Sequence, residues 1–154
     1  MTDFTARIQW QRGDAAFIDK RYSRAHTWHF DGGVSVPASS SPHSVKLPYS
    51  VAAAVDPEEA FVAALSSCHM LWFLDIAARA GWVVDDYVDD ARGVMTPNPQ
   101  GRLWLSCVTL RPAVRFAVAS RPDAAEVARL YHRAHEECFI ANSVRSEVRV
   151  EPTG

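Results

Sequence analysis

A long apolar helix, predicted over residues 57–79, is the feature that most restricts how this chain can fold. It begins at the clearest helix boundary in the sequence: Asp56 is an N-cap residue, Pro57 suits the first helical position, and Glu59 is placed for a capping box. Gly81 follows the last predicted turn, in the position where glycine commonly ends a helix. Few charges interrupt about six turns, so we expect this helix to be buried on most of its faces.

The other predicted elements are strands and one further helix. The sequence Arg-Pro-Asp at 121–123 opens the second helix, whose apolar positions recur at i, i+3, i+4, i+7 and i+11 and end at Cys138. Strands are predicted at 6–11, 22–30, 34–36 and 144–151, and two or three more within 87–96 and 102–118, with turns at 31–33 and 97–101. There is no βαβ rhythm and no internal repeat, so the predicted fold class is α+β.

Two expectations concern burial in the N-terminal part of the chain. The alternation in segment 6–11 places Ile8 on one side and charged or polar residues on the other, which predicts a half-buried strand. Segment 37–48 is rich in proline and serine, so we expect a loop that is too polar to bury and that is mobile.

Composition limits the class of protein. At 154 residues, with 48% hydrophobic and 22% charged residues, the chain fits a single domain over 1–154. The formal net charge of −2 and the lack of a dense Lys/Arg cluster argue against nucleic acid or an anionic membrane as partners. The N-terminus lacks the order of a signal peptide, and charges interrupt the apolar run, so we expect neither secretion nor a membrane span. Three cysteines favour reduced thiols in the cytoplasm.

Cys68 and Cys138 lie in helix-like apolar surroundings, seventy positions apart, and are the candidate reactive groups. If their side chains meet in the fold, the chain is a dithiol enzyme. The alternative is that each is a small buried hydrophobic residue, which cysteine often is. Cys107 lies in a predicted strand without charged neighbours, and we expect it in the core.

A reactive cysteine needs a pKa lowered by a cation or a helix dipole, because the thiolate is the nucleophile. Cys68 lies eleven residues beyond Pro57, where the helix dipole has faded, so a cation must come from elsewhere in the fold. Lys20, Arg21 and Arg24 are the candidates. Arginine suits best, because it stays charged when partly buried and can bridge a carboxylate and a thiolate.

His69, His132 and His135 raise the alternative of a metal site, since histidine and cysteine together suit zinc. Spacing argues against it: His132 and Cys138 lie about 240° apart around the helix, so these residues and His135 cannot converge. We therefore expect solvated histidines on helix surfaces.

Glu58 has two interpretations. With Glu59 it can serve as a capping acid at the helix start. It can instead hold an arginine at the thiolate, but ten residues of straight helix separate it from Cys68 by roughly 15 Å. Either a long arginine bridges the two, or Glu58 serves a thiol on a partner chain, as in a dimer with shared active sites.

Two segments resemble the OsmC/Ohr family of osmotically inducible and organic-hydroperoxide-resistance proteins. Residues 56–69 look like the family's proline-glutamate helix start, followed by small residues that lead to its first cysteine. Residues 134–143 are similar to its second-cysteine motif, although Phe139 stands where members usually have proline. The distance between the cysteines and the order of elements also agree, so the resemblance covers most of the chain from Tyr22 onward.

The resemblance implies an intertwined homodimer with antiparallel sheets wrapped around two central helices. It also implies a thiol peroxidase that uses no cofactor or metal. Cys68 would attack an organic hydroperoxide, Cys138 would resolve the sulfenic acid as a disulfide, and a dithiol such as dihydrolipoamide would reduce it. Glu58 falls on the family's glutamate, and Arg24, with Arg21 as the alternative, on its arginine. The other function to weigh is a noncatalytic protein that binds an apolar ligand at the dimer interface.

Overall fold

The computed structural model describes residues 1–119 and 121–153. It divides into two compact units, Met1–Ala60 and Phe61–Gly154. In chain order the elements are β1 (Ala6–Gln9), β2 (His26–Phe30), β3 (Ser35–Ala38), α1 (Pro57–Arg79), β4 (Val84–Asp89), β5 (Arg92–Pro97), β6 (Leu103–Leu110), β7 (Pro112–Phe116), α2 (Ala124–Glu137), a 3-10 turn (Ala141–Ser143) and β8 (Glu147–Val150). The predicted α+β class is confirmed, while a single domain over 1–154 stays a prediction.

The N-terminal unit holds one antiparallel sheet in the order β1-β2-β3. The predicted hairpin is confirmed: the Phe30 amide donates to the Val34 carbonyl at 2.9 Å, and Gly33 takes a φ of 87° that favours glycine. The prediction of a half-buried first strand is wrong for this chain, because Ile8 is 59% exposed and lies at an open cavity rather than under a second layer.

The serine-rich segment after β3 is folded and partly buried, contrary to the expectation of an exposed loop. Ser39 is fully enclosed, and Ser41 is also buried. The Ser39 hydroxyl accepts a hydrogen bond from the Val51 amide at 3.0 Å, and the Ser39 amide donates to the Val55 carbonyl. These hydrogen bonds offset the cost of burying the polar groups of Ser39.

Helix α1 begins and ends where the sequence predicts. The Glu59 amide donates to the Asp56 carboxylate at 2.8 Å, and the Asp56 amide donates back to the Glu59 carboxylate at 3.2 Å. This reciprocal pair is a capping box. At the other end Gly81 has a φ of 83°, and the Trp82 amide donates to the Ala77 carbonyl, which closes the last turn.

The C-terminal unit contains two sheets, β4-β7 and β5-β6-β8. Four strands replace the two or three predicted over 87–118, because the chain bends between β4 and β5 and again at Arg111. The Asp89 carboxylate stabilises these bends by accepting hydrogen bonds from the Arg111 amide, at 2.6 Å, and from the Ser66 hydroxyl. Strand β8 runs parallel to β6, so this sheet is mixed, whereas the other strand pairs are antiparallel.

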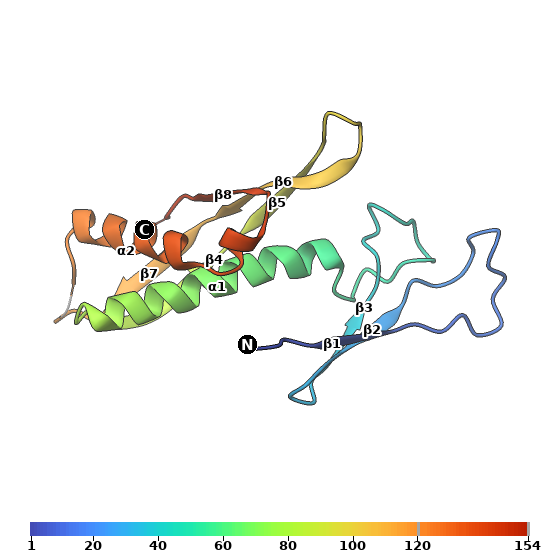
Figure 1. Cartoon of the computed structure of the whole chain (residues 1–154), viewed down its shortest axis with the longest axis horizontal. Helices are drawn as coiled ribbons and strands as arrows, with labels where there is room; N and C mark the ends of the chain where they lie inside the picture. The colour runs from blue at the N-terminus through green and yellow to red at the C-terminus, as the bar shows by residue number, and fades with distance from the viewer. Residues whose placement is uncertain (120, 154) are drawn as a thin grey trace. The chain divides into compact units, whose positions relative to one another are not determined.

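Helices α1 and α2 share the core of this unit, and Figure 1 shows them running alongside each other. The ring centroids of Phe73 and Tyr131 lie 4.7 Å apart. Leu130 and Ala134 are fully enclosed beside them. The predicted apolar stripe of the second helix is therefore confirmed, and it continues to Cys138, whose exposed fraction is 1%.

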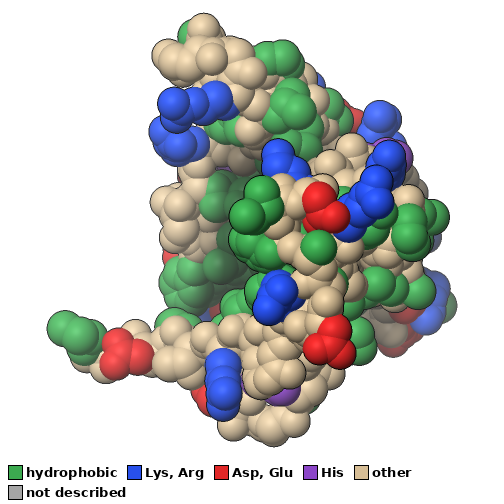
Figure 2. All heavy atoms as spheres, turned by 90° about the vertical axis from the view of Figure 1, so that its right-hand side faces the viewer, with side chains coloured by type: hydrophobic (Ala, Val, Ile, Leu, Met, Phe, Trp, Pro, Cys, Tyr) green, Lys and Arg blue, Asp and Glu red, His purple; other side chains and the backbone are tan. Residues whose placement is uncertain are grey.

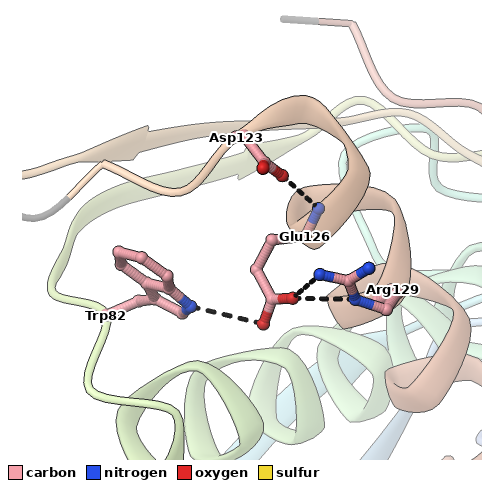
Figure 3. A network of polar contacts seen from close by, with 4 residues as sticks. All are labelled: Trp82, Asp123, Glu126 and Arg129. Carbon is pink, nitrogen blue, oxygen red and sulfur yellow. Dashed lines mark hydrogen bonds and ion pairs between the residues drawn. The ribbon is translucent and has the colours of Figure 1, made fainter.

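A polar network joins the start of α2 to the chain that follows α1 (Figure 3). The Asp123 carboxylate caps α2 by accepting from the Glu126 amide at 2.8 Å. The Glu126 carboxylate accepts from the Arg129 guanidinium and, at 3.4 Å, from the Trp82 indole. Hydrogen bonds from Arg129 hold the pKa of Glu126 below its usual value. The cap and the bonded carboxylate fix the register of α2 against the end of α1.

Much of α1 is uncovered in a single chain. Only Leu65, His69, Phe73, Ile76 and Ala77 of its 23 residues are buried, so the expected burial on most faces is wrong for this chain alone. By length and composition α1 could cross a membrane, but core helices of soluble proteins share these properties, and α1 packs on α2. The face in Figure 2 likewise exposes apolar side chains among scattered charges of both signs.

His69 is 1% exposed, so the prediction that it lies on the surface is wrong. Its Nδ1 lies 3.1 Å from the Tyr87 hydroxyl, and its ring stacks on Tyr131. Burial lowers the pKa of His69, with a smaller opposing contribution from the Tyr131 backbone. His132 is exposed, so the prediction of a surface histidine is confirmed for this residue, and its ring lies 3.1 Å from the Glu136 carboxylate. His135 is half-buried.

We expect acid to destabilise the fold through His69. The unfolded histidine takes up a proton as the pH falls below 6.5, whereas the buried one does so only at lower pH. The free energy of unfolding should therefore fall by up to about 1.4 kcal/mol per pH unit in that window. Urea unfolding of His69→Gln and wild type at fixed protein concentration, at pH 7.5 and 5.5, measures this slope.

The exposed His43 supplies the matched control, His43→Gln. His43→Gln should keep the wild-type slope and His69→Gln should flatten it. Equal slopes in all three proteins would contradict the role of His69.

Candidate functional site

Cys68 lies on α1 at the edge of an apolar cavity of about 610 Å³ in the C-terminal unit. The thiol is half-buried, so a small molecule in the cavity could reach it. Leu71 and Trp72 line the cavity, whereas the nearby Leu65 is buried in the core. The other lining residues are Ala64, Ser67, Asp75, Arg79, Phe139 and Ile140.

Cys138 lies just beyond the last turn of α2, where it is the C-cap residue. Its amide donates to the His135 carbonyl, and its sulfur accepts from the Ala141 amide at 3.4 Å. These bonds hold the thiol at the junction between α2 and the following 3-10 turn. The sulfur is enclosed, in contrast to that of Cys68.

The fold brings the two thiols close enough to interact, and both are free. Burial raises the pKa of Cys138 to about 11, and the interaction with the Cys68 side chain adds to this effect. The amide of Ala141 opposes it weakly. At neutral pH the Cys138 thiol therefore keeps its proton, and the more open Cys68 is the sulfur that an outside molecule can reach.

Phe139 forms a wall of the Cys68 cavity. Its ring packs edge-on against Trp72 with centroids 5.2 Å apart, and its side chain is 68% exposed. The residue directly after Cys138 thus widens the apolar surface beside the thiols.

Cys107 is half-buried in β6, not enclosed in the core as expected. Its sulfur lies 3.9 Å from the Thr109 hydroxyl, and it does not line the Cys68 cavity. Cys107 lies on the outward side of β6, which explains its partial exposure.

Arg24 lies in the N-terminal unit, at a separate cavity of about 460 Å³. Its guanidinium donates to the carbonyls of Lys20, at 2.7 Å, and Tyr22, and stacks 3.9 Å above the Tyr22 ring. Arg24 is half-buried, whereas Arg21 and Lys20 are exposed and do not line this cavity. Of the three cations considered, Arg24 alone is held in place at a cavity.

The two glutamates at the start of α1 have different surroundings. Glu59 closes the capping box, whereas Glu58 is half-buried and lines the same cavity as Arg24. In the part of the chain that the structure describes, no ion pair joins Glu58 to Arg24. Capping therefore accounts for Glu59 and leaves Glu58 available to the cavity.

An aromatic cluster beside Arg24 escaped the sequence analysis. Trp10, Phe17 and Tyr22 contact one another, and the Phe17 and Tyr22 rings stack with centroids 4.7 Å apart. All three line the Arg24 cavity. Their spacing follows neither a strand nor a helix period, so no periodic signal pointed to them.

Among the described residues, no group of three or more His, Cys, Asp or Glu side chains is arranged to hold a metal ion. His69 instead bonds to Tyr87, and His132 to Glu136.

Comparison with known proteins places the chain in a family. Residues 50–153 match the family described as OsmC-like protein. No curated protein matches the sequence. Among solved structures, an OsmC-like protein of unknown function from Vibrio cholerae is 52% identical, with a TM-score of 0.96 over 99% of this chain and 100% of that one.

More distant structures share the fold. An organic hydroperoxide resistance protein from Legionella pneumophila is 17% identical, with a TM-score of 0.69 over 99% of this chain and 96% of that one. The organic hydroperoxide resistance protein OhrB of Bacillus subtilis is 20% identical, with a TM-score of 0.66 over 97% and 98% of the two chains. The family match over residues 50–153 and the 52% identity to the Vibrio cholerae protein show that this chain belongs to the OsmC-like protein family.

Proposed function

We propose that this chain is a cytoplasmic, cysteine-based thiol peroxidase that reduces organic hydroperoxides through a Cys68–Cys138 disulfide cycle. The observation that carries the proposal is the interaction between an open thiol and an enclosed one. Oxidation can join two thiols that lie within reach of each other as a disulfide. The names of the hydroperoxide resistance proteins that share the fold agree with this chemistry.

In the first step the Cys68 thiolate attacks the outer oxygen of the hydroperoxide, ROOH. The O–O bond breaks, Cys68 becomes a sulfenic acid, and the alkoxide takes a proton and leaves as the alcohol. In the second step the Cys138 sulfur attacks the Cys68 sulfur. The S–S bond forms, and the sulfenic oxygen leaves as water with the proton from Cys138. A dithiol such as dihydrolipoamide then reduces the disulfide by two exchanges and is itself oxidised to a cyclic disulfide.

The cavity at Cys68 favours hydroperoxides with an apolar body. Leu71, Trp72, Phe139 and Ile140 are the large apolar side chains in its lining, and Leu71 is 60% exposed. An organic substrate gains by covering this surface, whereas hydrogen peroxide does not. The same surface also suits the alternative, a noncatalytic protein that binds an apolar ligand there.

We further propose a homodimer in which Arg24 and Glu58 of one subunit serve the thiols of the other. The exposed apolar side chains of α1 support this, since a second copy of the chain would cover surface that is costly to leave in water. Arg24 would favour the Cys68 thiolate, and Glu58 would orient Arg24.

The cysteine variants test the cycle. Cys68→Ser should abolish consumption of tert-butyl hydroperoxide with dihydrolipoamide as reductant, because no other sulfur is open to the cavity. Cys138→Ser should complete one turnover and then accumulate sulfinic Cys68, seen by peptide mass analysis. Cys107→Ser is the matched control and should keep wild-type turnover. Full turnover by Cys68→Ser would refute the assignment, whereas no turnover by the wild type would favour the ligand-binding alternative.

The raised pKa of Cys138 predicts unequal thiol reactivity. Relative to an ordinary cysteine, a pKa of about 11 leaves roughly 100-fold less thiolate at neutral pH. Iodoacetamide at pH 7.5 should therefore label Cys68 long before Cys138, as followed by peptide mapping over time. Equal rates at the two cysteines would contradict the enclosed position of Cys138.

Arg24 and Arg21 form a matched pair for testing the cation. Arg24→Gln should raise the pKa of Cys68 and slow the first step, because the thiolate loses its positive partner, whereas Arg21→Gln should change neither. Absorbance of the thiolate at varied pH in a Cys107→Ser background measures the pKa. The reverse pattern would move the role to Arg21.

Mixed dimers test whether sites are shared. A heterodimer of Arg24→Gln and Cys68→Ser subunits has one intact site only if Arg24 acts on the partner's thiol. Statistical exchange of the two impaired variants should then bring activity to about a quarter of the wild-type level. No recovery, with exchange shown by mass analysis, would place Arg24 and Cys68 of the same chain together.

A further inference from the structure

The C-terminal unit has another cavity, formed by β7 and the first half of α2. Its volume is about 500 Å³, in the range of small-molecule sites. It shares no lining residue with the Cys68 cavity. Its walls are mainly apolar and include Val114, Phe116, Pro122, Val127 and Pro152.

The charged side chains that line this cavity are both cationic, Arg115 and Arg121, and no Asp or Glu of the described residues lines it. Arg115 is already paired, at 3.0 Å, with Asp85. Arg121 makes no ion pair or hydrogen bond in the part of the chain that the structure describes. Its guanidinium is therefore free to bind an anion, for which a carboxylate matches its geometry.

Tyr131 provides a second polar group. The side chain is 94% buried, since its exposed fraction is 6%, and it packs between His69 and Phe73. Unlike the Tyr87 hydroxyl, which bonds to His69, the Tyr131 hydroxyl has no hydrogen-bond partner among the described residues. The small exposed part of Tyr131 lines this cavity and a smaller neighbouring one. The Tyr131 hydroxyl oxygen is not enclosed, so a ligand in the cavity can bond to it.

Burial raises the pKa of Tyr131 to about 12, so the hydroxyl keeps its proton and can donate it to an acceptor. The N-terminus of α2 contributes less, because Asp123 already accepts from the Glu126 amide there. The polar side chains, and not the helix end, therefore define the kind of ligand.

We propose that this cavity binds a small carboxylate with an apolar, ring-sized body, and that Arg121 and the Tyr131 hydroxyl bind its carboxylate group. The body packs on Phe116 and Val127. This site is independent of the thiol chemistry, so its existence does not depend on peroxidase activity.

The probe is 2-naphthoate, with neutral 2-naphthalenemethanol as its matched analogue, in NMR titrations of ¹⁵N-labelled full chain carrying Cys68→Ser. Naphthoate should cause saturable amide shifts at residues 114–116 and 124–131, with a Kd on the order of 1 mM. The neutral analogue should bind about tenfold more weakly, because it lacks the charge-assisted bond.

Variants assign the contacts. Arg121→Gln should weaken naphthoate binding about tenfold, and Tyr131→Phe about threefold or more. Arg133→Gln, which removes the same charge from α2 outside this cavity, should leave the Kd unchanged. Shifts confined to the Cys68 cavity, equal affinity for the two probes, or equal weakening by Arg121→Gln and Arg133→Gln would each overturn the proposal.

Discussion

The packing of α2 on α1 is the interaction on which the thiol site depends. Phe73 and Tyr131 form its aromatic centre, and Ala134 is enclosed in the same cluster. Cys68 lies five residues before Phe73 and Cys138 seven residues after Tyr131, so this contact determines how the sulfurs meet. Truncation of Phe73 to alanine would lower the free energy of unfolding by on the order of 3–5 kcal/mol. It would loosen the core and, with it, the thiol pair.

The two cysteines have the same side chain, but their surroundings give the two thiols different exposure and different reactivity. Cys138 ends a helix, is enclosed, and accepts a bond from the Ala141 amide, whereas Cys68 opens onto an apolar cavity. In the proposed cycle, burial would keep the proton on Cys138 until the second step, when the departing oxygen needs one. The proposed order of attack and resolution follows from this difference in exposure, and the apolar lining supports the proposed preference for organic over inorganic peroxide.

Short sequence signals made much of the fold predictable. The capping box at Asp56 and the stripe that ends at Cys138 are encoded within a few residues, and the family motifs pointed to both cysteines. What failed depends on distant partners: His69 is buried because β4 brings Tyr87 to it, and Ser39 because a later segment supplies Val51. Arg24 could not be separated from Arg21 until the backbone carbonyls that hold it were known.

The most direct test of the central claim is the fate of both sulfurs after one oxidation. Reduced protein is mixed with one equivalent of tert-butyl hydroperoxide at neutral pH and analysed by intact mass and peptide mapping. The account predicts rapid loss of two hydrogen atoms, with a disulfide mapped to Cys68 and Cys138 and Cys107 unchanged. Free thiols after the same treatment would contradict a peroxide-reactive pair, while the OsmC-like fold would stand.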